Sequence, residues 1–221
     1  MKVLVFAPHS DDEVLGVGGT IAKHCAQGDE VYVCIVTKGA EPLFDKEPAD
    51  RVIAEAVEAH KVLGVMDTIF LNFPAAMLET VPRYELNRAV LQVVTDSKPD
   101  VVYLPHAHDM QRDHGLVSEA AMVALRPKHD HVVKKIYAYE TLSETEWSIP
   151  NAANAFVPTV WNDISGFLDM KIKAMKQYKS QLGEFPNPRS LEAIESLAKL
   201  RGSTVLVKAA EAFVVIREIR C

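Results

Sequence analysis

Short apolar runs alternate with amphipathic stretches along most of this chain. The runs expected to form strands are residues 3–7, 29–37, 68–73, 101–104, 134–139 and 212–219. The stretches with helical spacing are residues 49–63, 84–97, 116–125, 166–180 and 189–200, together with a segment that follows Glu13 and ends near Gly28. Uninterrupted runs rich in branched residues are typical of strands buried on both faces, and amphipathic stretches are typical of helices that cover a sheet.

The order of these elements predicts the fold class. A strand, a helix and a second strand within the first 37 residues imply a right-handed crossover between parallel strands. We therefore expect an α/β, Rossmann-like fold, with a mostly parallel sheet flanked by helices and with additions toward the C-terminus. The length of 221 residues predicts a single domain over residues 1–221.

Four ionisable residues follow the first apolar run. The run stops at Pro8, and His9, Asp11, Asp12 and Glu13 come directly after it. Open α/β sheets bind ligands at the carboxyl ends of their strands, which is where this cluster is expected to lie. So many charges repel one another unless a cation or a hydrogen-bond network holds them. An N-terminal helix cap, the alternative, would explain only one or two of the carboxylates.

Glycines follow this cluster within the expected first helix. Gly16, Gly18 and Gly19 fall within four residues of one another. Glycine has no side chain beyond the backbone, so we expect another part of the chain to pack closely against the helix here.

A second polar cluster, PHAHDMQRDHG, follows the run at 101–104. Parallel strands bring their carboxyl ends to one edge, so the two clusters are expected to meet. Imidazole and carboxylate together suit zinc or iron, and an enzyme site keeps a position open for water. His9 and Asp12 with one histidine of the second cluster would complete such a set. Residue chemistry leaves open which of His106, His108 and His114 takes part.

Composition narrows the function classes further. The formal net charge of −6 argues against a nucleic-acid or anionic-membrane surface. No apolar segment approaches the roughly 20 residues of a membrane span, and no signal-peptide pattern is visible. Three cysteines form no disulfide framework, so we expect Cys25 and Cys34 to be buried, Cys221 to be free and the protein to be cytoplasmic. We expect the remaining histidines to lie on the surface, namely His24, His60, His129 and His131.

The two clusters and their context resemble a known family. APHSDDE followed by VLGVGGTIAKH is similar to the AHPDDE signature of the PIG-L/LmbE-like N-acetylglucosamine deacetylases, and VYLPHAHDMQRDHG is similar to that family's second motif. The similarity also covers the helix from Arg51 to Gly64, YETLSETEW and KIKAMKQYKSQ. The resemblance implies a metal-dependent hydrolase that acts on an N-acetylglucosamine-type sugar or conjugate.

The resemblance also implies roles for particular residues. His9, Asp12 and His114 would hold Zn²⁺, or Fe²⁺ or another divalent ion. Asp11 would be the general base that activates water, and Asp113 would support the chemistry from beside the metal ligands. Arg51 would contact the sugar, with an exposed charge near the helix start as the alternative. Members of this family often form trimers or hexamers, so the resemblance implies a homo-oligomer.

Three positions depart from the family pattern. Ser10 replaces a common proline, which would change only local stiffness. Gln111 stands where relatives often have a histidine, and glutamine can donate a hydrogen bond but cannot exchange a proton near neutral pH. Asn187 also stands where a histidine is expected. One hypothesis is that His108 substitutes for Gln111 as a catalytic group, while Gln111 contacts the substrate.

Two alternatives stay open, and the departures at Gln111 and Asn187 motivate the second of them. The same residues would serve a metal-dependent amidase whose substrate is not a sugar. The second alternative is a family member that binds a metal or a sugar without turnover. Asp11 argues against it, because a purely structural metal site has no use for a base beside an open position. A nucleotide-binding enzyme is disfavoured because the first loop has no glycine-rich phosphate cradle.

Overall fold

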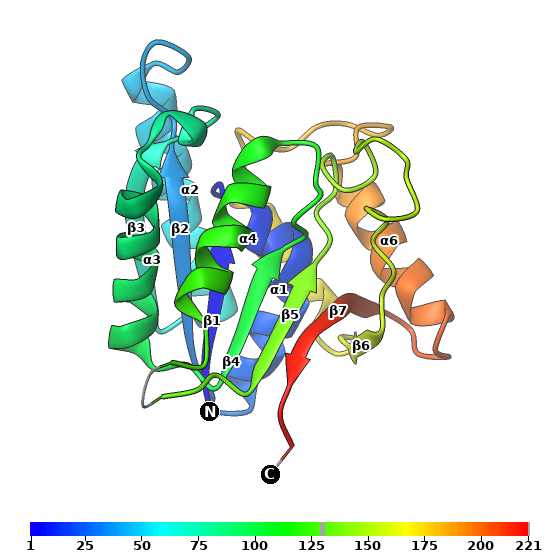
Figure 1. Cartoon of the computed structure of the whole chain (residues 1–221). Helices are drawn as coiled ribbons and strands as arrows, with labels where there is room; N and C mark the ends of the chain where they lie inside the picture. The colour runs from blue at the N-terminus through cyan, green and yellow to red at the C-terminus, as the bar shows by residue number, and fades with distance from the viewer. Residues whose placement is uncertain (129–130, 221) are drawn as a thin grey trace.

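The computed structural model contains a seven-stranded sheet with the strand order β3-β2-β1-β4-β5-β7-β6 (Figure 1). The structure describes residues 1–128 and 131–220. The strands are β1 (Lys2–Ala7), β2 (Glu30–Lys38), β3 (Asp67–Pro74), β4 (Val101–Pro105), β5 (Lys135–Tyr139), β6 (Val160–Asp163) and β7 (Ala210–Glu218). The first five strands pair in parallel, and β7 runs antiparallel to both β5 and β6. The mostly parallel α/β fold expected from the sequence is confirmed.

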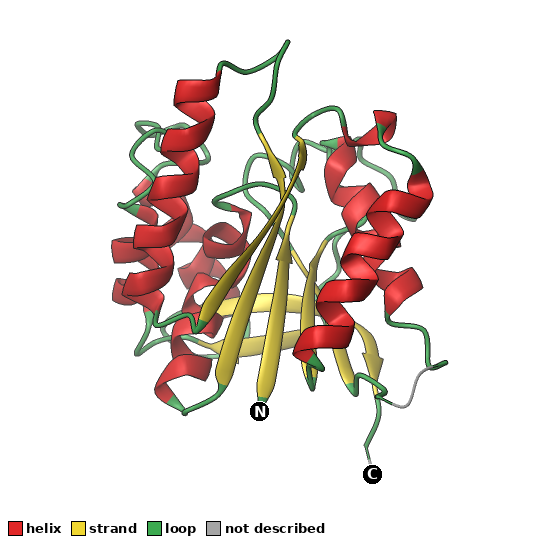
Figure 2. Cartoon of the chain, turned by 90° about the vertical axis from the view of Figure 1, so that its left-hand side faces the viewer, coloured by secondary structure: helices red, strands yellow, loops and turns green. Residues whose placement is uncertain are grey.

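Helices cover both faces of this sheet (Figure 2). They are α1 (Asp12–Ala26), α2 (Lys46–Leu63), α3 (Arg83–Ser97), α4 (Arg112–Ala124), α5 (Leu168–Met175) and α6 (Leu191–Ser203), with a short 3₁₀ helix η1 (Leu78–Thr80) before α3. Alternate residues of β1 enter different cores, since Val3 and Val5 pack with α1, α2, α5 and α6, whereas Leu4 and Phe6 pack with α3 and α4. This two-sided burial explains why the strand is apolar without interruption.

The predicted elements differ from the observed ones mainly near the C-terminus. Strand β6 was not expected, because residues 150–158 contain two prolines and the strand has only four residues, Val160–Asp163. Helix α5 ends at Met175, earlier than the predicted end at Ser180, and the following turn carries Tyr178 into the interior. Helix α4 begins at Arg112, four residues before the predicted start, so its first turn belongs to the second polar cluster.

The glycines of α1 lie where other segments approach closely. A Cβ atom on Gly16 would stand 2.2 Å from the Tyr139 ring, and one on Gly19 would stand 2.6 Å from Ile164. Gly18 faces the stem of Lys171. The expectation of close packing along this helix is therefore confirmed. Among the described residues, no helix is both long enough and apolar enough to cross a membrane.

Candidate active site

The site begins where β1 ends and α1 starts. His9 and Asp11 lie in the turn between them, and Asp12 is the first residue of α1. Asp11 has φ 108°, a backbone conformation that residues other than glycine rarely adopt. Such a conformation costs on the order of 1–3 kcal/mol. The backbone N–H of His9 donates to Asp12 Oδ2 at 2.8 Å, which closes the turn. The local chain therefore aims two carboxylates into the same small volume.

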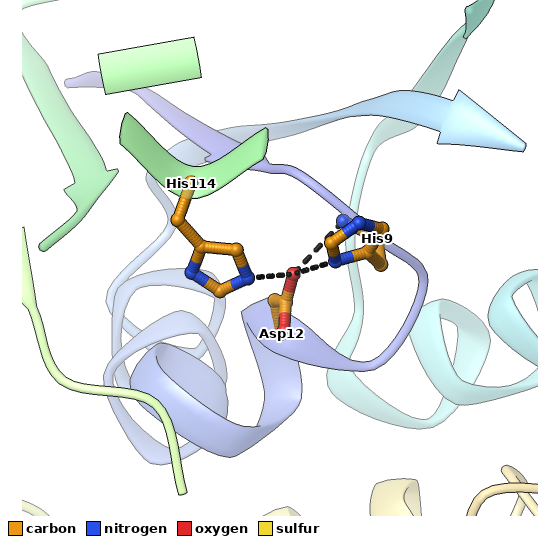
Figure 3. A group of neighbouring side chains, drawn as sticks. All are labelled: His9, Asp12 and His114. Carbon is orange, nitrogen blue, oxygen red and sulfur yellow. Dashed lines mark hydrogen bonds and ion pairs between the residues drawn. The ribbon is translucent and has the colours of Figure 1, made fainter. Parts of the chain in front are cut away.

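Three side chains from the two clusters meet here (Figure 3). His9, Asp12 and His114 each offer one ligand atom, and these atoms lie within 4.8 Å of one another. Asp12 Oδ2 lies between the rings, 3.2 Å from His9 Nδ1 and 3.3 Å from His114 Nε2. His9 follows β1, and His114 lies in the first turn of α4, which follows β4. The neighbouring parallel strands β1 and β4 therefore bring together residues more than 100 positions apart.

Each histidine is oriented by a carboxylate on its far side. His9 Nε2 lies 3.0 Å from Asp113 Oδ2, and His114 Nδ1 lies 2.8 Å from Asp109 Oδ2. Asp109 in turn accepts a hydrogen bond of 2.6 Å from the Thr145 hydroxyl. Such outer carboxylates fix the ring and its tautomer, leaving the opposite nitrogen free for a cation. The carboxylate that orients His114 is therefore that of Asp109. Asp113, which directly precedes His114 in the sequence, orients His9 instead.

The residues fit a divalent cation. Within the described residues, His114 Nε2 and Asp12 Oδ1 are buried without a hydrogen-bond partner. Burial by itself would raise the pKa of Asp12, but the charges of His114 and His9 and their hydrogen bonds together hold this pKa well below its usual range. Burial also lowers the pKa of His9, yet hydrogen bonds to Asp113 and Asp12 raise it to about 9. The surrounding carboxylates thus favour positive charge here, whether carried by protons or by a metal ion.

Asp11 lies beside this group in a different environment. Its side chain is 1% exposed, and Oδ1 has no partner among the described residues. Burial raises the pKa of Asp11 to about 8, although the guanidinium of Arg189 opposes the shift. Arg189 Nη1 donates to Asp11 Oδ2 at 3.2 Å. A carboxyl group with a pKa near neutrality can both accept and return a proton.

A cavity of about 330 Å³ opens beside these groups. Its polar lining residues include His9, Asp11, Gln111 and Arg189. Its apolar lining residues are Phe44, Pro48, Ala49, Val52, Ile53, Ala75 and Ala76. A concave site with a largely apolar lining and a few convergent polar groups is typical of a small-molecule site.

Comparison with known proteins assigns this arrangement to a family. The family model described as PIG-L: GlcNAc-PI de-N-acetylase matches residues 4–125, which contain both polar clusters. The chain belongs to the PIG-L family. It is therefore assigned to a family of deacetylases, as the two motifs predicted.

Individual relatives of this PIG-L chain agree with that assignment. An uncharacterized deacetylase of Escherichia coli, YaiS, is 27% identical over 80% of this chain and 90% of its own length. Diacetylchitobiose deacetylase of Thermococcus kodakarensis is 26% identical over 83% of this chain and 71% of its own length. The crystal structure of the conserved protein TT1542 from Thermus thermophilus superposes with a TM-score of 0.80 at 28% identity, covering 99% of this chain and 96% of that one.

Two residues that the sequence analysis singled out, Arg51 from the resemblance and His108 as a substitute for Gln111, lie away from the cavity. Arg51 is 56% exposed in its side chain and pairs with Glu47 at 3.4 Å. Arg51 is not among the residues that line the cavity, although its α2 neighbours Ala49, Val52 and Ile53 are. His108 is exposed, and its ring packs edge-on against His106 at 5.5 Å between centroids. The structure does not bring either side chain to the wall of the cavity.

Gln111 does reach the cavity, where it meets the metal candidates. Its Nε2 lies 3.3 Å from His9 Nε2, and its Oε1 accepts a hydrogen bond of 2.6 Å from the backbone N–H of Asp113. It therefore caps α4 with its oxygen and directs its amide nitrogen toward the site. Asn187, the other departure, is exposed and accepts from the backbone N–H of Arg189 at 2.8 Å.

The sequence analysis missed three side chains of the site. Asp109 and Glu144 lie within segments that the sequence analysis named, PHAHDMQRDHG and YETLSETEW, but neither residue was given a role there. Arg189 lies in the loop before α6, 178 positions from its partner Asp11. Glu144 Oε2 accepts from the backbone N–H of Gln111 at 3.0 Å, and Glu144 Oε1 lies 3.7 Å from Arg189. The signals that could have found them were the family-like segments that contain Asp109 and Glu144 and, for Arg189, a charge in a proline-rich loop.

The expectations for the other histidines and the cysteines were partly wrong. His60 is 3% exposed and belongs to the interior, because its ring pairs with buried Glu13. His24 is partly buried and His131 is exposed. Cys34 is buried, as predicted, whereas Cys25 is only partly buried. His129 and Cys221 lie outside the described residues.

Proposed function

We propose that the protein hydrolyses the N-acetyl group of an N-acetylglucosamine-type sugar or sugar conjugate, with a zinc ion as its cofactor. The observation that carries this proposal is the meeting of His9, Asp12 and His114 directly beside Asp11 and an open cavity. The family match and the deacetylase names of the relatives support the same reaction.

His9, Asp12 and His114 would hold the cation, with His9 Nδ1 and His114 Nε2 as the free nitrogens. When bound, the metal would polarise the amide carbonyl and lower the pKa of water. Two nitrogens and one carboxylate form a donor set that suits zinc, and iron(II) would accept the same set. Asp113 and Asp109 would keep the two rings in the ligating tautomer.

Asp11 would move the proton in this reaction. Its carboxylate lines the cavity and would take the proton from the attacking water. It would then return that proton to the amine as the C–N bond breaks, which yields acetate and the free amino sugar. Arg189 would hold one carboxylate oxygen in place and leave Oδ1 for the water.

Gln111 would contact the substrate at the reacting carbonyl. Its amide nitrogen faces the site and can donate a hydrogen bond to the oxygen on which negative charge develops. It cannot supply a proton, so Asp11 alone would have to serve both proton transfers. The apolar lining residues Val52 and Ile53 would pack against the apolar face of the sugar ring.

The deciding experiment measures metal content and amine release together. Purified protein loaded with zinc is incubated with N-acetylglucosamine, diacetylchitobiose and an N-acetylated amine that is not a sugar. Asp11→Asn is compared with the wild type, and Asp96→Asn, an exposed residue of α3, is the matched control. We expect about one metal per chain in all three proteins, and a fall in turnover of about 10²–10⁴-fold in Asp11→Asn alone.

Other outcomes would select an alternative. Turnover of only the non-sugar amide would indicate an amidase with a different substrate. Bound metal without turnover of any compound would support a binding role, with Gln111 as its cause. Absence of bound metal after loading with zinc or iron would contradict the proposal.

We also propose where the protein lies in the cell, how it assembles and how many domains it has, from its cysteines, its family resemblance and its length. The absence of a disulfide framework in the sequence favours the cytoplasm. The resemblance favours a trimer or hexamer, which light scattering of the purified chain would test. The length of the chain favours one domain over residues 1–221.

A further inference from the structure

Glu13 is the one ionisable residue of the first cluster without a place in the site described above. It is fully buried in the first turn of α1 and does not line the cavity. Its Oε2 accepts a hydrogen bond of 3.2 Å from the backbone N–H of Asp11. Its Oε1 accepts from the Tyr178 hydroxyl at 2.6 Å and lies 3.1 Å from His60 Nε2.

Asp11 needs such support because of its backbone conformation. At φ 108° an aspartate is strained, and a residue stays there only when its surroundings hold it. The carbonyl of Asp11 accepts from the N–H groups of Val14 and Leu15 at 3.0 and 2.9 Å, as the start of a helix requires. The amide N–H on its other side would be left unpaired without Glu13. Glu13 therefore completes the hydrogen bonding of the backbone on both sides of Asp11.

The groups behind Glu13 come from distant parts of the chain. His60 lies on α2, and its Nδ1 is 2.7 Å from the hydroxyl of Thr68 on β3. Tyr178 follows α5 and is completely buried. If the Thr68 hydroxyl donates to His60 Nδ1, then His60 Nε2–H donates to Glu13, and every group in this hydrogen-bond network has a partner. A buried network without unpaired members is rigid, so the Glu13 carboxylate has one position.

We infer that Glu13, anchored by His60 and Tyr178, is a positioning residue that sets the direction of the Asp11 carboxylate. This inference rests on the proposed function for its effect on turnover, because Asp11 is the proposed base. Glu13 acts only through the backbone of Asp11 and touches neither the substrate nor the metal candidates. Its contribution should therefore appear in kcat, while KM and metal content stay constant.

The test is Glu13→Gln. Glutamine keeps the size of the side chain but has only one acceptor oxygen for three donors, and the NH2 group that replaces the other oxygen cannot accept a hydrogen bond from the backbone N–H of Asp11. We expect kcat to fall about 10- to 100-fold, with KM and bound zinc within about twofold of the wild type. Tyr178→Phe keeps the carboxylate and removes one anchor, so we expect a smaller fall of about 2- to 10-fold. This second variant also covers the case in which Glu13→Gln does not fold.

Glu211→Gln is the matched control. Glu211 is also a buried glutamate that accepts backbone N–H groups of α1, namely those of Gly19 and Thr20 at 2.9 and 2.7 Å. It contacts neither Asp11 nor the cavity, so this variant should unfold at a lower temperature but keep the kcat of the folded protein. A general loss of packing would lower kcat in both variants.

Crystal structures of the wild type and of Glu13→Gln provide a readout that needs no turnover. We expect the Asp11 backbone to leave the positive-φ region in the variant and its carboxylate to shift. An unchanged Asp11, or an unchanged kcat beside a shifted Asp11, would overturn the inference. If the wild type releases no amine from any compound offered, the proposed function fails, while the two crystal structures still decide whether Glu13 positions Asp11.

Discussion

Two buried polar clusters contact helix α1, and they differ in how completely their groups are paired. In the middle of the helix, Lys171 Nζ donates to Leu15 O at 2.7 Å and to Glu211 Oε1 at 2.6 Å. Glu211 accepts two further bonds from backbone N–H groups of α1. At the start of the helix, three buried atoms have no hydrogen-bond partner among the described residues, namely Asp11 Oδ1, Asp12 Oδ1 and His114 Nε2.

This difference distinguishes a structural cluster from a site. Buried polar atoms are normally paired, because an unpaired one costs about 1–3 kcal/mol. The Lys171–Glu211 pair meets this rule and joins α1 to α5 and β7. The cluster around Asp12 breaks the rule at the edge of a cavity, where a cation and a water molecule could supply the missing partners. Polarity and burial alone do not separate the two clusters, whereas pairing does.

The largest effect is expected when the incomplete cluster loses its central charge. Asp12→Asn removes the negative charge between His9 and His114, so we expect bound metal below about 0.1 per chain and turnover lowered at least about 100-fold. Elemental analysis and amine release measure both. A chelator should lower the melting temperature of the wild type but not of the variant, since only the wild type has metal to lose. Full metal occupancy in Asp12→Asn would contradict the assignment of ligands.

Breaking the complete cluster should change stability instead. Lys171→Met leaves Glu211 buried with its charge uncompensated, so we expect the free energy of unfolding to fall by about 3–5 kcal/mol. Urea denaturation measures this change. Metal content and kcat of the folded protein should match the wild type. A variant that kept its stability but lost its metal would show that the two clusters are not separate.

Packing along α1, which joins the clusters, should contribute less. Gly16→Ala would place a Cβ 2.2 Å from the Tyr139 ring and 2.9 Å from the Glu140 carbonyl oxygen. We expect a loss of about 1–3 kcal/mol in unfolding free energy. Gly166→Ala is the control, because a Cβ there meets nothing within 4 Å and should change stability by no more than about 0.5 kcal/mol. Equal effects in the two variants would indicate a cause other than packing.

The smallest effects are expected from residues outside both clusters. Arg51 forms one exposed ion pair, and His108 lies on an exposed loop, so alanine at either position should change kcat/KM by less than about twofold. Steady-state kinetics on the substrate found above would measure this. A rise in KM of about tenfold in Arg51→Ala would mean that the substrate extends past the cavity wall. A fall in kcat in His108→Ala would restore the hypothesis that this histidine substitutes for Gln111.

Local patterns in the sequence carried most of the fold and part of the candidate site. The apolar run at Val3–Ala7 predicts a strand buried on both faces, and the rule for parallel strands brings His9 and His114 to one edge. These inferences succeed because periodicity and chain direction are local properties. The roles of His9, Asp12 and His114 as ligands came from resemblance to a family, and the structure adds that their atoms meet.

Only the tertiary structure decided which side chains pair. Arg189 contacts Asp11 across 178 positions, and Tyr178 contacts Glu13 across 165. The pattern of apolar residues in α2 was compatible with an exposed His60, yet His60 is buried because its ring pairs with the buried carboxylate of Glu13. Such pairs depend on how α2, α5 and the loop before α6 pack against the first turn of α1. No local sequence pattern encodes that packing. The sequence therefore determined which edge of the sheet carries the candidate site, and the tertiary structure determined which side chains hold its residues in position.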